Sequence, residues 1–293
     1  LTSLPGPHGI GDLGAGARAF LEFLDSADQS LWQFCPLGPT SDAYGHSPYA
    51  ADSAFAGNPL LVDLRDLVER GYLTEGEVDG PEGADPHTVN YDAVASFKRD
   101  RLRTAHERFV ADADESARES FAAFREREAH WLADYALFAA LKETHDGAAW
   151  TDWPDDLARR HEDALAAARE THADAVAYHA FVQWVFDEQW RDLRAAANDR
   201  GIDLVGDVPL YVAADSADVW AHQDVFELAA DGTPAVVAGV PPNPGDDGQR
   251  WGNPVYDWAR LRETDYGWWV DRVERLLSRV DLARLDHFKG FDE

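Results

Sequence analysis

An arginine and an aspartate two residues apart stand in a short apolar run near the end of the chain, Leu282-Ala283-Arg284-Leu285-Asp286-His287. If this run is a strand, Arg284 and Asp286 point to the same side, because side chains alternate along a strand. An arginine beside a carboxylate keeps it ionised and oriented, as the nucleophile of a retaining glycosidase requires. The same spacing suits a salt bridge inside a barrel, and spacing alone favours neither interpretation.

Asp207 is a second candidate, because it is a carboxylate within an otherwise apolar run, Leu204-Val205-Gly206-Asp207. A buried carboxylate needs a partner, and Arg284 could be that partner. Some loop aromatic residues could stack on the apolar faces of sugar rings: Tyr44, Tyr49 and Trp251. Single loop aromatics are common, but a cluster of them beside two carboxylates indicates a carbohydrate site.

Other chemistries lack the motifs that they require. The sequence has no Cys/His cluster with metal-ligand spacing, no calcium-binding loop, no serine elbow and no Walker-type loop. We therefore expect no metal and no cofactor. The segment Gly9-Ile10-Gly11-Asp12-Leu13-Gly14 fits a dinucleotide-binding pattern, but the prolines before it exclude a central strand. We interpret it as a turn before a helix that begins near Ala15.

The charge of the chain limits its partners. Lys and Arg number 26, and Asp and Glu number 55, which gives a net charge of −29 over 293 residues. Such a chain should repel phosphate backbones and anionic surfaces, so we expect neither nucleic acid nor membrane partners. The only lysines are Lys98, Lys142 and Lys289. An acidic, lysine-poor surface suits high salt, where screening reduces self-repulsion, and predicts a halophilic source.

The composition favours a folded cytoplasmic protein. Hydrophobic residues make up 45% of the chain and there are 11 tryptophans, so disorder is not expected. The single cysteine, Cys35, excludes an internal disulfide. No apolar run approaches the roughly 18 residues of a membrane span, and the start does not resemble a secretory signal. Because the chain has no methionine and no closing helix after Phe291, we expect a piece of a longer protein.

Three regions differ in their sequence pattern. Residues 1–66 are rich in Gly, Pro and aromatic residues, and predict the start of a barrel with a long substrate loop. Residues 67–200 carry apolar residues at helical spacing, with a capping-box pattern at Ser116 and Glu119, and predict a mainly helical insertion. Residues 201–293 return to short apolar runs and predict the continuation of the barrel.

Individual elements follow from the same patterns. We expect a helix near Ala15, strands within 31–37, 202–212 and 280–285, a short helix over 218–226, a Pro/Gly loop over 239–253 and an amphipathic helix over 266–280. A helix that leads into a short apolar strand ending in polar residues is typical of a β/α barrel, whose chemistry sits at the carboxyl ends of the strands. The expected fold class is therefore α/β.

Several long motifs occur in one order along the whole chain, including Gly206-Asp207-Val208-Pro209-Leu210-Tyr211-Val212. The others are 2–14, 32–40 with 47–49, 215–220, 237–242, 248–254 and 284–291. Together they resemble the amylomaltases, the 4-α-glucanotransferases also called disproportionating enzymes. The resemblance implies a partial (β/α)8 barrel of the α-amylase type with a helical insertion, and no obligatory metal. It also implies retaining transfer of α-1,4-glucan segments between maltodextrins.

The resemblance further implies roles for single residues. Asp286 would be the nucleophile, and Arg284 would orient it. Asp207 and His287 would hydrogen-bond the hydroxyls of the sugar at the cleavage subsite, and Tyr49 would stack on that sugar. The remaining residues are those of the lid and acceptor side, Gln249, Trp251 and Asn253, and a secondary glucan contact, Tyr44.

Two features depart from the family pattern. The lid stretch Asn243-Pro244-Gly245-Asp246-Asp247 is one residue shorter and lacks the usual aromatic residue. The family's acid/base is a Glu on the strand after the nucleophile, which we expect outside this chain, because Glu293 does not stand at the matching place. Two alternatives to a glucanotransferase therefore stay open: an α-glucan hydrolase with the same nucleophile, and a non-catalytic glucan-binding remnant.

Overall fold

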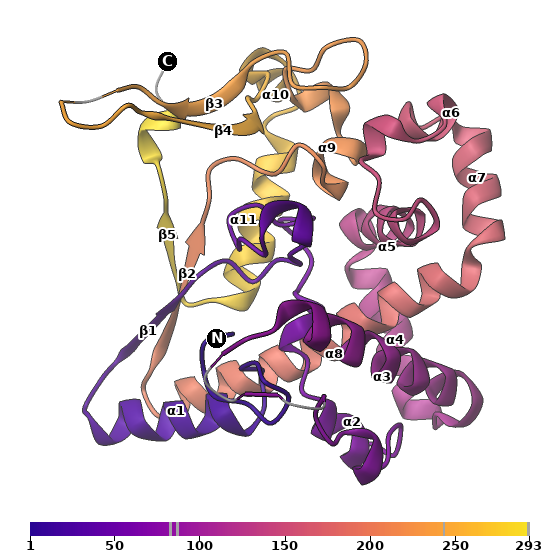
Figure 1. Ribbon diagram of the computed structural model, residues 1–293, viewed down its shortest axis with the longest axis vertical. Coiled ribbons are helices and arrows are strands. Elements are labelled where there is room, and N and C mark those ends of the chain that lie inside the picture. The colour runs from indigo at the N-terminus through magenta and orange to yellow at the C-terminus, as the bar shows by residue number, and fades with distance from the viewer. Residues whose placement is uncertain (82–83, 86–87, 243, 292–293) are drawn as a thin grey trace.

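A parallel three-stranded sheet, in the order β1-β2-β5, lies along one side of the molecule, at the left of Figure 1. The computed structural model describes residues 1–293 apart from 82–83, 86–87, 243 and 292–293. The strands are β1 (Leu31–Phe34), β2 (Asp203–Val208) and β5 (Leu282–Leu285). Each lies within a segment for which the sequence predicts a strand, and the α/β class is confirmed.

A helix leads into each strand of this sheet. These helices are α1 (Ala15–Ser26), α8 (Ala173–Asn198) and α11 (Gly267–Arg279). The predicted helices near Ala15 and over 266–280 are thus confirmed. Gly206 of β2 permits the close packing of α11, because a Cβ at this position would lie 3.0 Å from Cγ1 of Val280 and 3.2 Å from Cδ1 of Leu276.

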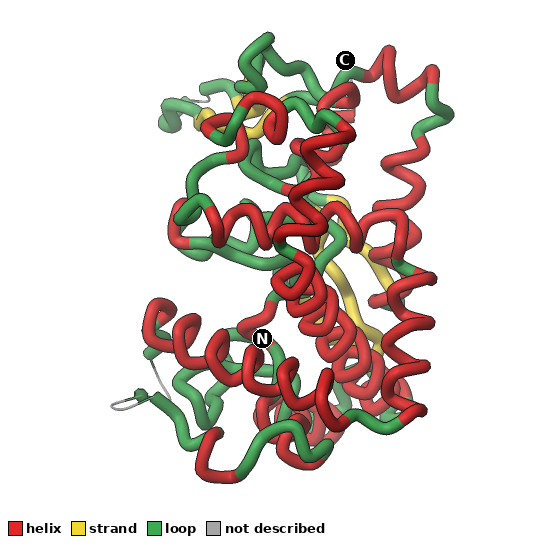
Figure 2. Tube along the Cα trace, turned by 90° about the vertical axis from the view of Figure 1, so that its right-hand side faces the viewer, coloured by secondary structure: helices red, strands yellow, loops and turns green. Residues whose placement is uncertain are grey.

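Most of the chain between β1 and β2 is helical. The helices are α2 (Leu64–Glu69), α3 (Tyr91–Asp112), α4 (Glu115–Arg127), α5 (Ala129–Thr144), α6 (Asp155–Ala158) and α7 (Glu162–Thr171). When the side of the molecule that carries these helices faces the viewer, they lie in front of the strands of the three-stranded sheet (Figure 2). Within the described ranges, no helix has the length and apolar content to cross a membrane. The region boundaries at residues 66 and 200 stay a prediction.

Aromatic side chains fill the core between these helices and the sheet. Phe181, Trp184, Phe186 and Trp190 of α8 are all buried. The ring of Trp190 packs edge-on against Phe34 of β1, with ring centroids 5.2 Å apart. Helix α8 therefore connects the helical region to the sheet through its apolar face.

The Pro/Gly loop expected over 239–253 was wrong at both ends of that range. Strands β3 (Val237–Val240) and β4 (Gln249–Pro254) pair there as an antiparallel hairpin. Glycine is required at 239 because a Cβ would come within 2.2 Å of the Gln249 carbonyl oxygen, and Gly248 takes the left-handed φ of +76° beside the turn. The glycines that indicated a loop thus serve a hairpin. Two short helices flank it, α9 (Ala217–Ala221) and α10 (Trp258–Glu263).

The capping box expected at Ser116 and Glu119 was also wrong. Helix α4 begins at Glu115, and the Asp114 carboxylate accepts a hydrogen bond from the Ala117 backbone N–H at 2.8 Å. Ser116 lies inside the first turn of this helix. Aspartate is as good an N-cap as serine, and here it stands two residues earlier.

Strand β5 forms one side of the three-stranded sheet. Among the described residues it pairs with β2, and each of its four residues is exposed. Leu282 and Leu285 are therefore large apolar side chains in contact with solvent.

Lys98 of α3 is a charged group at the centre of the N-terminal packing. Its ammonium donates to the carbonyl oxygens of Leu60 at 2.8 Å and Val62 at 2.7 Å, and lies 3.3 Å from Oδ2 of Asp12. Lys98 is 1% exposed and Asp12 is 2% exposed. The buried Lys98 ammonium therefore links helix α3 to two other segments of the chain, at Asp12 and at residues 60–62.

Replacing Lys98 by methionine should destabilise the protein strongly. The variant leaves the Asp12 carboxylate buried without its cation, which costs about 3–5 kcal/mol of unfolding free energy. Urea unfolding of Lys98→Met measures the change. The same replacement at the exposed Lys289 is the control, and should cost less than about 1 kcal/mol. An equal cost at both positions would contradict the structural role of Lys98.

Candidate active site

The guanidinium of Arg284 forms ion pairs with two carboxylates at one end of the three-stranded sheet. Its Nη1 lies 2.6 Å from Oδ1 of Asp207, and its Nη2 lies 2.5 Å from Oδ1 of Asp286. The sheet register creates this arrangement, because Asp207 of β2 is paired with Arg284 of β5 and both side chains point to one side. The hydrogen bond to Asp207 and the charge of Asp207 raise the pKa of Arg284.

The two carboxylates differ in their surroundings. The side chain of Asp207 is 4% exposed, whereas that of Asp286 is 39% exposed. Both oxygens of Asp207 are engaged, because Oδ2 accepts a hydrogen bond from the Tyr49 hydroxyl at 2.9 Å. Within the described part of the chain, Oδ2 of Asp286 has no side-chain partner. Asp286 is therefore the carboxylate that can meet a ligand.

Tyr49 comes to the site from the long loop that follows β1. Burial and the hydrogen bond to Asp207 raise the pKa of its phenol, so it stays a hydrogen-bond donor. Arg284 and Tyr49 together hold Asp207 from two sides. The pairing of Asp207 with Arg284, which the sequence offered as one possibility, is thus present in the structure, and Tyr49 adds a second partner.

An open cavity of about 520 Å³ lies beside Asp286. Its lining includes Tyr49, Trp251 and His287, and also Tyr211. The rings of Trp251 and His287 meet edge-to-face, with centroids 4.9 Å apart. His287 has a left-handed φ of +51°, a conformation that is uncommon outside glycine and marks a local constraint. Aromatic walls beside an exposed carboxylate suit a sugar ring.

Gln249 and Asn253 belong to strand β4 of the hairpin, and Asn253 also lines the cavity beside Asp286. Oε1 of Gln249 accepts a hydrogen bond from the Trp251 indole N–H at 3.0 Å. Nδ2 of Asn253 donates to the carbonyl oxygen of Val212 at 2.7 Å. One amide thus orients the Trp251 ring, and the other fixes the hairpin to the segment after β2.

Two aromatic residues stand differently from expectation. Tyr44 is not among the residues that line the cavity around Asp286; burial raises its pKa, and the nearest groups that affect it are Asp215 and Asp52. Tyr211 was not chosen from the sequence, yet its ring centroid lies 6.4 Å from Trp251 and 6.5 Å from His287. The feature of the sequence that could have pointed to Tyr211 is its position four residues after Asp207.

One group in the described part of the chain could hold a metal ion, whereas no metal is expected from the sequence motifs. It consists of Asp42, His46 and Asp92. Asp42 begins a short helical turn, Asp42–Tyr44, in the loop that carries Tyr49. This group shares no residue with the cavity around Asp286.

The chain belongs to the 4-alpha-glucanotransferase family, glycoside hydrolase family 77, whose model matches residues 1–293. It is 50% identical over 292 residues to a 4-alpha-glucanotransferase of Thermus thermophilus, covering 99% of this chain and 57% of the relative. A 4-alpha-glucanotransferase of Synechocystis sp. is 45% identical, with 99% and 58% covered. The chain thus spans less than three-fifths of these relatives.

A solved structure supports the same assignment. The chain is similar to the amylomaltase from Streptococcus agalactiae in complex with acarbose, with a TM-score of 0.93 and 40% identity. The similarity covers 99% of this chain and 58% of that one. The resemblance noted from the motifs is therefore confirmed at the level of the family.

The loop of Tyr49 is anchored by acidic residues. Oδ2 of Asp218 accepts a hydrogen bond from the Ala54 N–H at 2.8 Å. The backbone of Asp52 is bonded on both sides, because its N–H donates to Pro39 O at 2.9 Å and its carbonyl accepts from Ala217 N at 2.8 Å. Burial raises the pKa of the Asp52 carboxyl to about 7, against the opposing effect of Lys142.

The contribution of Asp52 to stability should therefore fall as the pH rises from about 4 to 7. Asp52 binds its proton more tightly in the folded protein than in the unfolded chain, so this contribution is present at low pH and is lost through pH 7. Asparagine resembles the protonated acid but does not titrate. The Asp52→Asn variant should therefore lack this pH-dependent decrease in unfolding free energy, which is at most about 4 kcal/mol. Urea unfolding at several pH values measures the difference between the two proteins.

Two features of this experiment separate Asp52 from other groups. Burial also raises the pKa of Asp218 to about 6, but that group is common to both proteins and cancels in the difference. The exposed Asp112 provides a matched control, and Asp112→Asn should keep the wild-type pH dependence. An unchanged pH dependence in Asp52→Asn would show that Asp52 is ionised without cost.

Proposed function

We propose that the protein containing this chain is a 4-α-glucanotransferase that moves α-1,4-glucan segments between maltodextrins by a retaining double displacement. The observation that carries the proposal is the exposed Asp286 carboxylate, held by Arg284 beside an aromatic cavity, in a chain of this family. The S. agalactiae relative was solved with acarbose, which supports a glucan ligand. Maltooligosaccharides and fragments of starch or glycogen are the proposed partners.

The proposed first step is attack of Asp286 on the anomeric carbon. The C1–O bond to the leaving glucan breaks, its oxygen takes a proton from a general acid, and the donor segment becomes a glycosyl ester of Asp286. A hydroxyl of the acceptor then attacks C1, gives its proton to the same acid/base, and releases the carboxylate. Two inversions give net retention.

Neighbouring residues support this step in distinct ways. Arg284 orients Asp286 through Oδ1, which leaves Oδ2 for the anomeric carbon. His287 would hydrogen-bond sugar hydroxyls, and Asp207 would accept a hydrogen bond from one only if the Tyr49 hydroxyl gives up its place on Oδ2. Tyr49 and Trp251 offer rings to sugar faces, and Tyr44 would contact glucan at a secondary position. Gln249 and Asn253 would fix the lid on the acceptor side.

The acid/base is proposed to come from a part of the protein outside this chain. The chain spans 57% of the T. thermophilus relative, and the engaged Asp207 does not suit proton transfer. Glu293 lies outside the described residues. The three parallel strands would then be part of a (β/α)8 barrel, with the helices between β1 and β2 as its insertion.

Transfer and hydrolysis differ in the second nucleophile. A hydrolase with the same Asp286 would use water and release only shorter products, whereas a transferase makes longer maltodextrins as well as glucose from maltotriose. A glucan-binding remnant would bind maltotriose and produce neither. Chromatography of the products of the whole protein distinguishes the three, and the reading frame downstream of this chain shows whether an acid/base Glu follows.

The Asp286→Asn variant should lower kcat by at least about a thousandfold, because the covalent step loses its nucleophile. Glucan binding should change little, since the ring contacts remain. Disproportionation of maltotriose by the whole protein gives kcat, and isothermal titration calorimetry gives the affinity. The exposed Asp271 is the matched control, and Asp271→Asn should keep wild-type activity. More than about a tenth of the activity in Asp286→Asn would exclude the assignment.

We also propose that this is a salt-adapted protein of the cytoplasm. The net charge is −29, and like charges repel less when salt screens them. Its Tm should therefore be higher in molar KCl than at about 0.1 M, and its activity should follow. Thermal melts at both concentrations test this, and a Tm that is flat or falls with KCl would refute the adaptation.

A further inference from the structure

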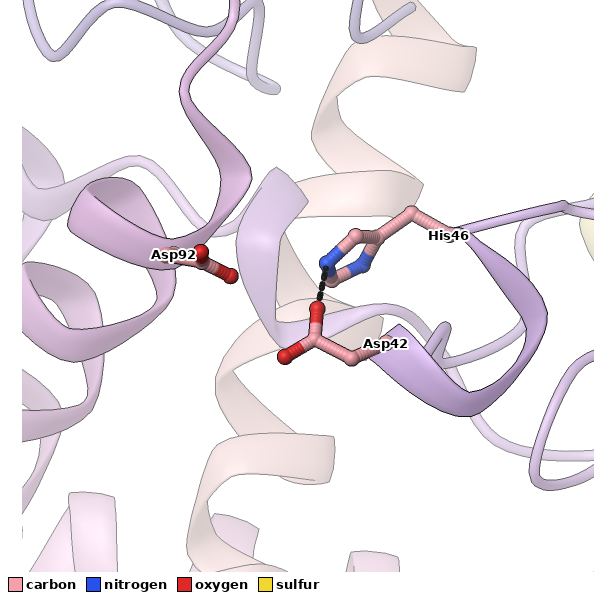
Figure 3. A group of neighbouring side chains, drawn as sticks. All are labelled: Asp42, His46 and Asp92. Carbon is pink, nitrogen blue, oxygen red and sulfur yellow. Dashed lines mark ion pairs between the residues drawn. The ribbon is translucent and has the colours of Figure 1, made fainter.

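Three potential metal ligands meet outside the lining of the cavity beside Asp286. Asp42 lies in the loop after β1, His46 follows it by four residues, and Asp92 lies in the first turn of α3. One ligand atom of each lies within 4.8 Å of the other two. Figure 3 shows the Asp92 carboxylate pointing toward the pair formed by Asp42 and His46.

The imidazole of His46 is held in place before any ligand binds. Its side chain is 10% exposed, and its ring stacks on Tyr91 with centroids 4.3 Å apart and planes 13° apart. Nδ1 lies 3.3 Å from the Thr40 hydroxyl, which also accepts a hydrogen bond from Asn58 Nδ2 at 3.3 Å. A histidine that binds a metal typically has its other ring nitrogen fixed in this way.

The other ring nitrogen of His46 is buried and aimed at the carboxylates. Nε2 lies 2.6 Å from Oδ1 of Asp42 in an ion pair, but the two groups do not form a hydrogen bond. An ion pair without a hydrogen bond leaves a buried nitrogen incompletely satisfied, whereas a shared cation would satisfy the nitrogen and the oxygen together. This is the observation that separates the group from an ordinary acidic cluster.

We propose that Asp42, His46 and Asp92 bind a divalent first-row transition cation of the Zn²⁺ type. One imidazole nitrogen and two carboxylate oxygens are ligands that Zn²⁺ accepts, whereas Ca²⁺ and Mg²⁺ prefer oxygen alone. Asp42 is 76% exposed, so water can complete a tetrahedron. The net charge of −29 adds a general attraction for cations.

Such a cation would cross-link two segments that are far apart in the sequence. Asp42 and His46 belong to the loop that also carries Tyr49, and Asp92 belongs to α3. Binding to the folded state alone stabilises that state by mass action. The cation would therefore raise the stability of the loop against α3 without touching the reacting atoms.

Zinc binding by the tag-free whole protein tests the site. After dialysis against EDTA, isothermal titration calorimetry with ZnCl2 gives stoichiometry and affinity, and CoCl2 gives the visible absorption of a tetrahedral site. We expect His46→Gln and Asp92→Asn each to lose one Zn²⁺ per chain relative to wild type, or to bind it at least about 100-fold more weakly. Titrations with CaCl2 and MgCl2 should show no such difference.

Matched controls distinguish this site from adventitious binding. His161 and Asp100 are exposed, and His161→Gln and Asp100→Asn should bind Zn²⁺ as the wild type does. Melting of every variant in EDTA shows whether it folds, and if one ligand variant does not, the other and the cobalt spectrum still decide. Equal stoichiometry and affinity in the wild type and a folded ligand variant, or absence of a cobalt spectrum, would overturn the proposal.

Discussion

The register between β2 and β5 is the constraint on which the site depends. It pairs Asp207 with Arg284, and a slip of one residue would turn Arg284 to the other face of the sheet. Helix α11 fixes this register, because the buried Arg272 donates to the carbonyl oxygen of Leu210, beyond the end of β2, at 2.9 Å. The chain then runs directly from α11 into β5, so helix docking and strand pairing position the same guanidinium.

Asp207 and Asp286 are the same type of residue, but their surroundings make them differ in accessibility and bonding. Asp207 has both oxygens bonded and is nearly inaccessible, so its charge is committed to the structure. Asp286 shares only one oxygen with Arg284 and faces the cavity. The loop of Tyr49, anchored through Asp218 and the backbone of Asp52, supplies the second donor to Asp207. A distant loop thus helps decide which carboxylate is open to the cavity.

Local patterns predicted the elements better than they predicted the contacts. The three strands and the pair Arg284 and Asp286 could be found because alternation along a strand is a property of adjacent residues. The β3–β4 hairpin was missed because glycines usually predict a loop, whereas here they permit the close approach of the two strands. Tyr211 was missed although it stands four residues after Asp207. The closeness of Asp92 to His46 could not be found, because only tertiary packing brings these two residues together.

The left-handed backbone of His287 has a consequence for the turn that follows β5. A residue other than glycine in this conformation costs on the order of 1 kcal/mol and keeps it only where surrounding contacts hold it. The edge-to-face contact with the Trp251 ring is one such contact, and Trp251 belongs to the β3–β4 hairpin. A displacement of the hairpin would therefore reach the backbone next to Asp286, so that two walls of the cavity are mechanically coupled.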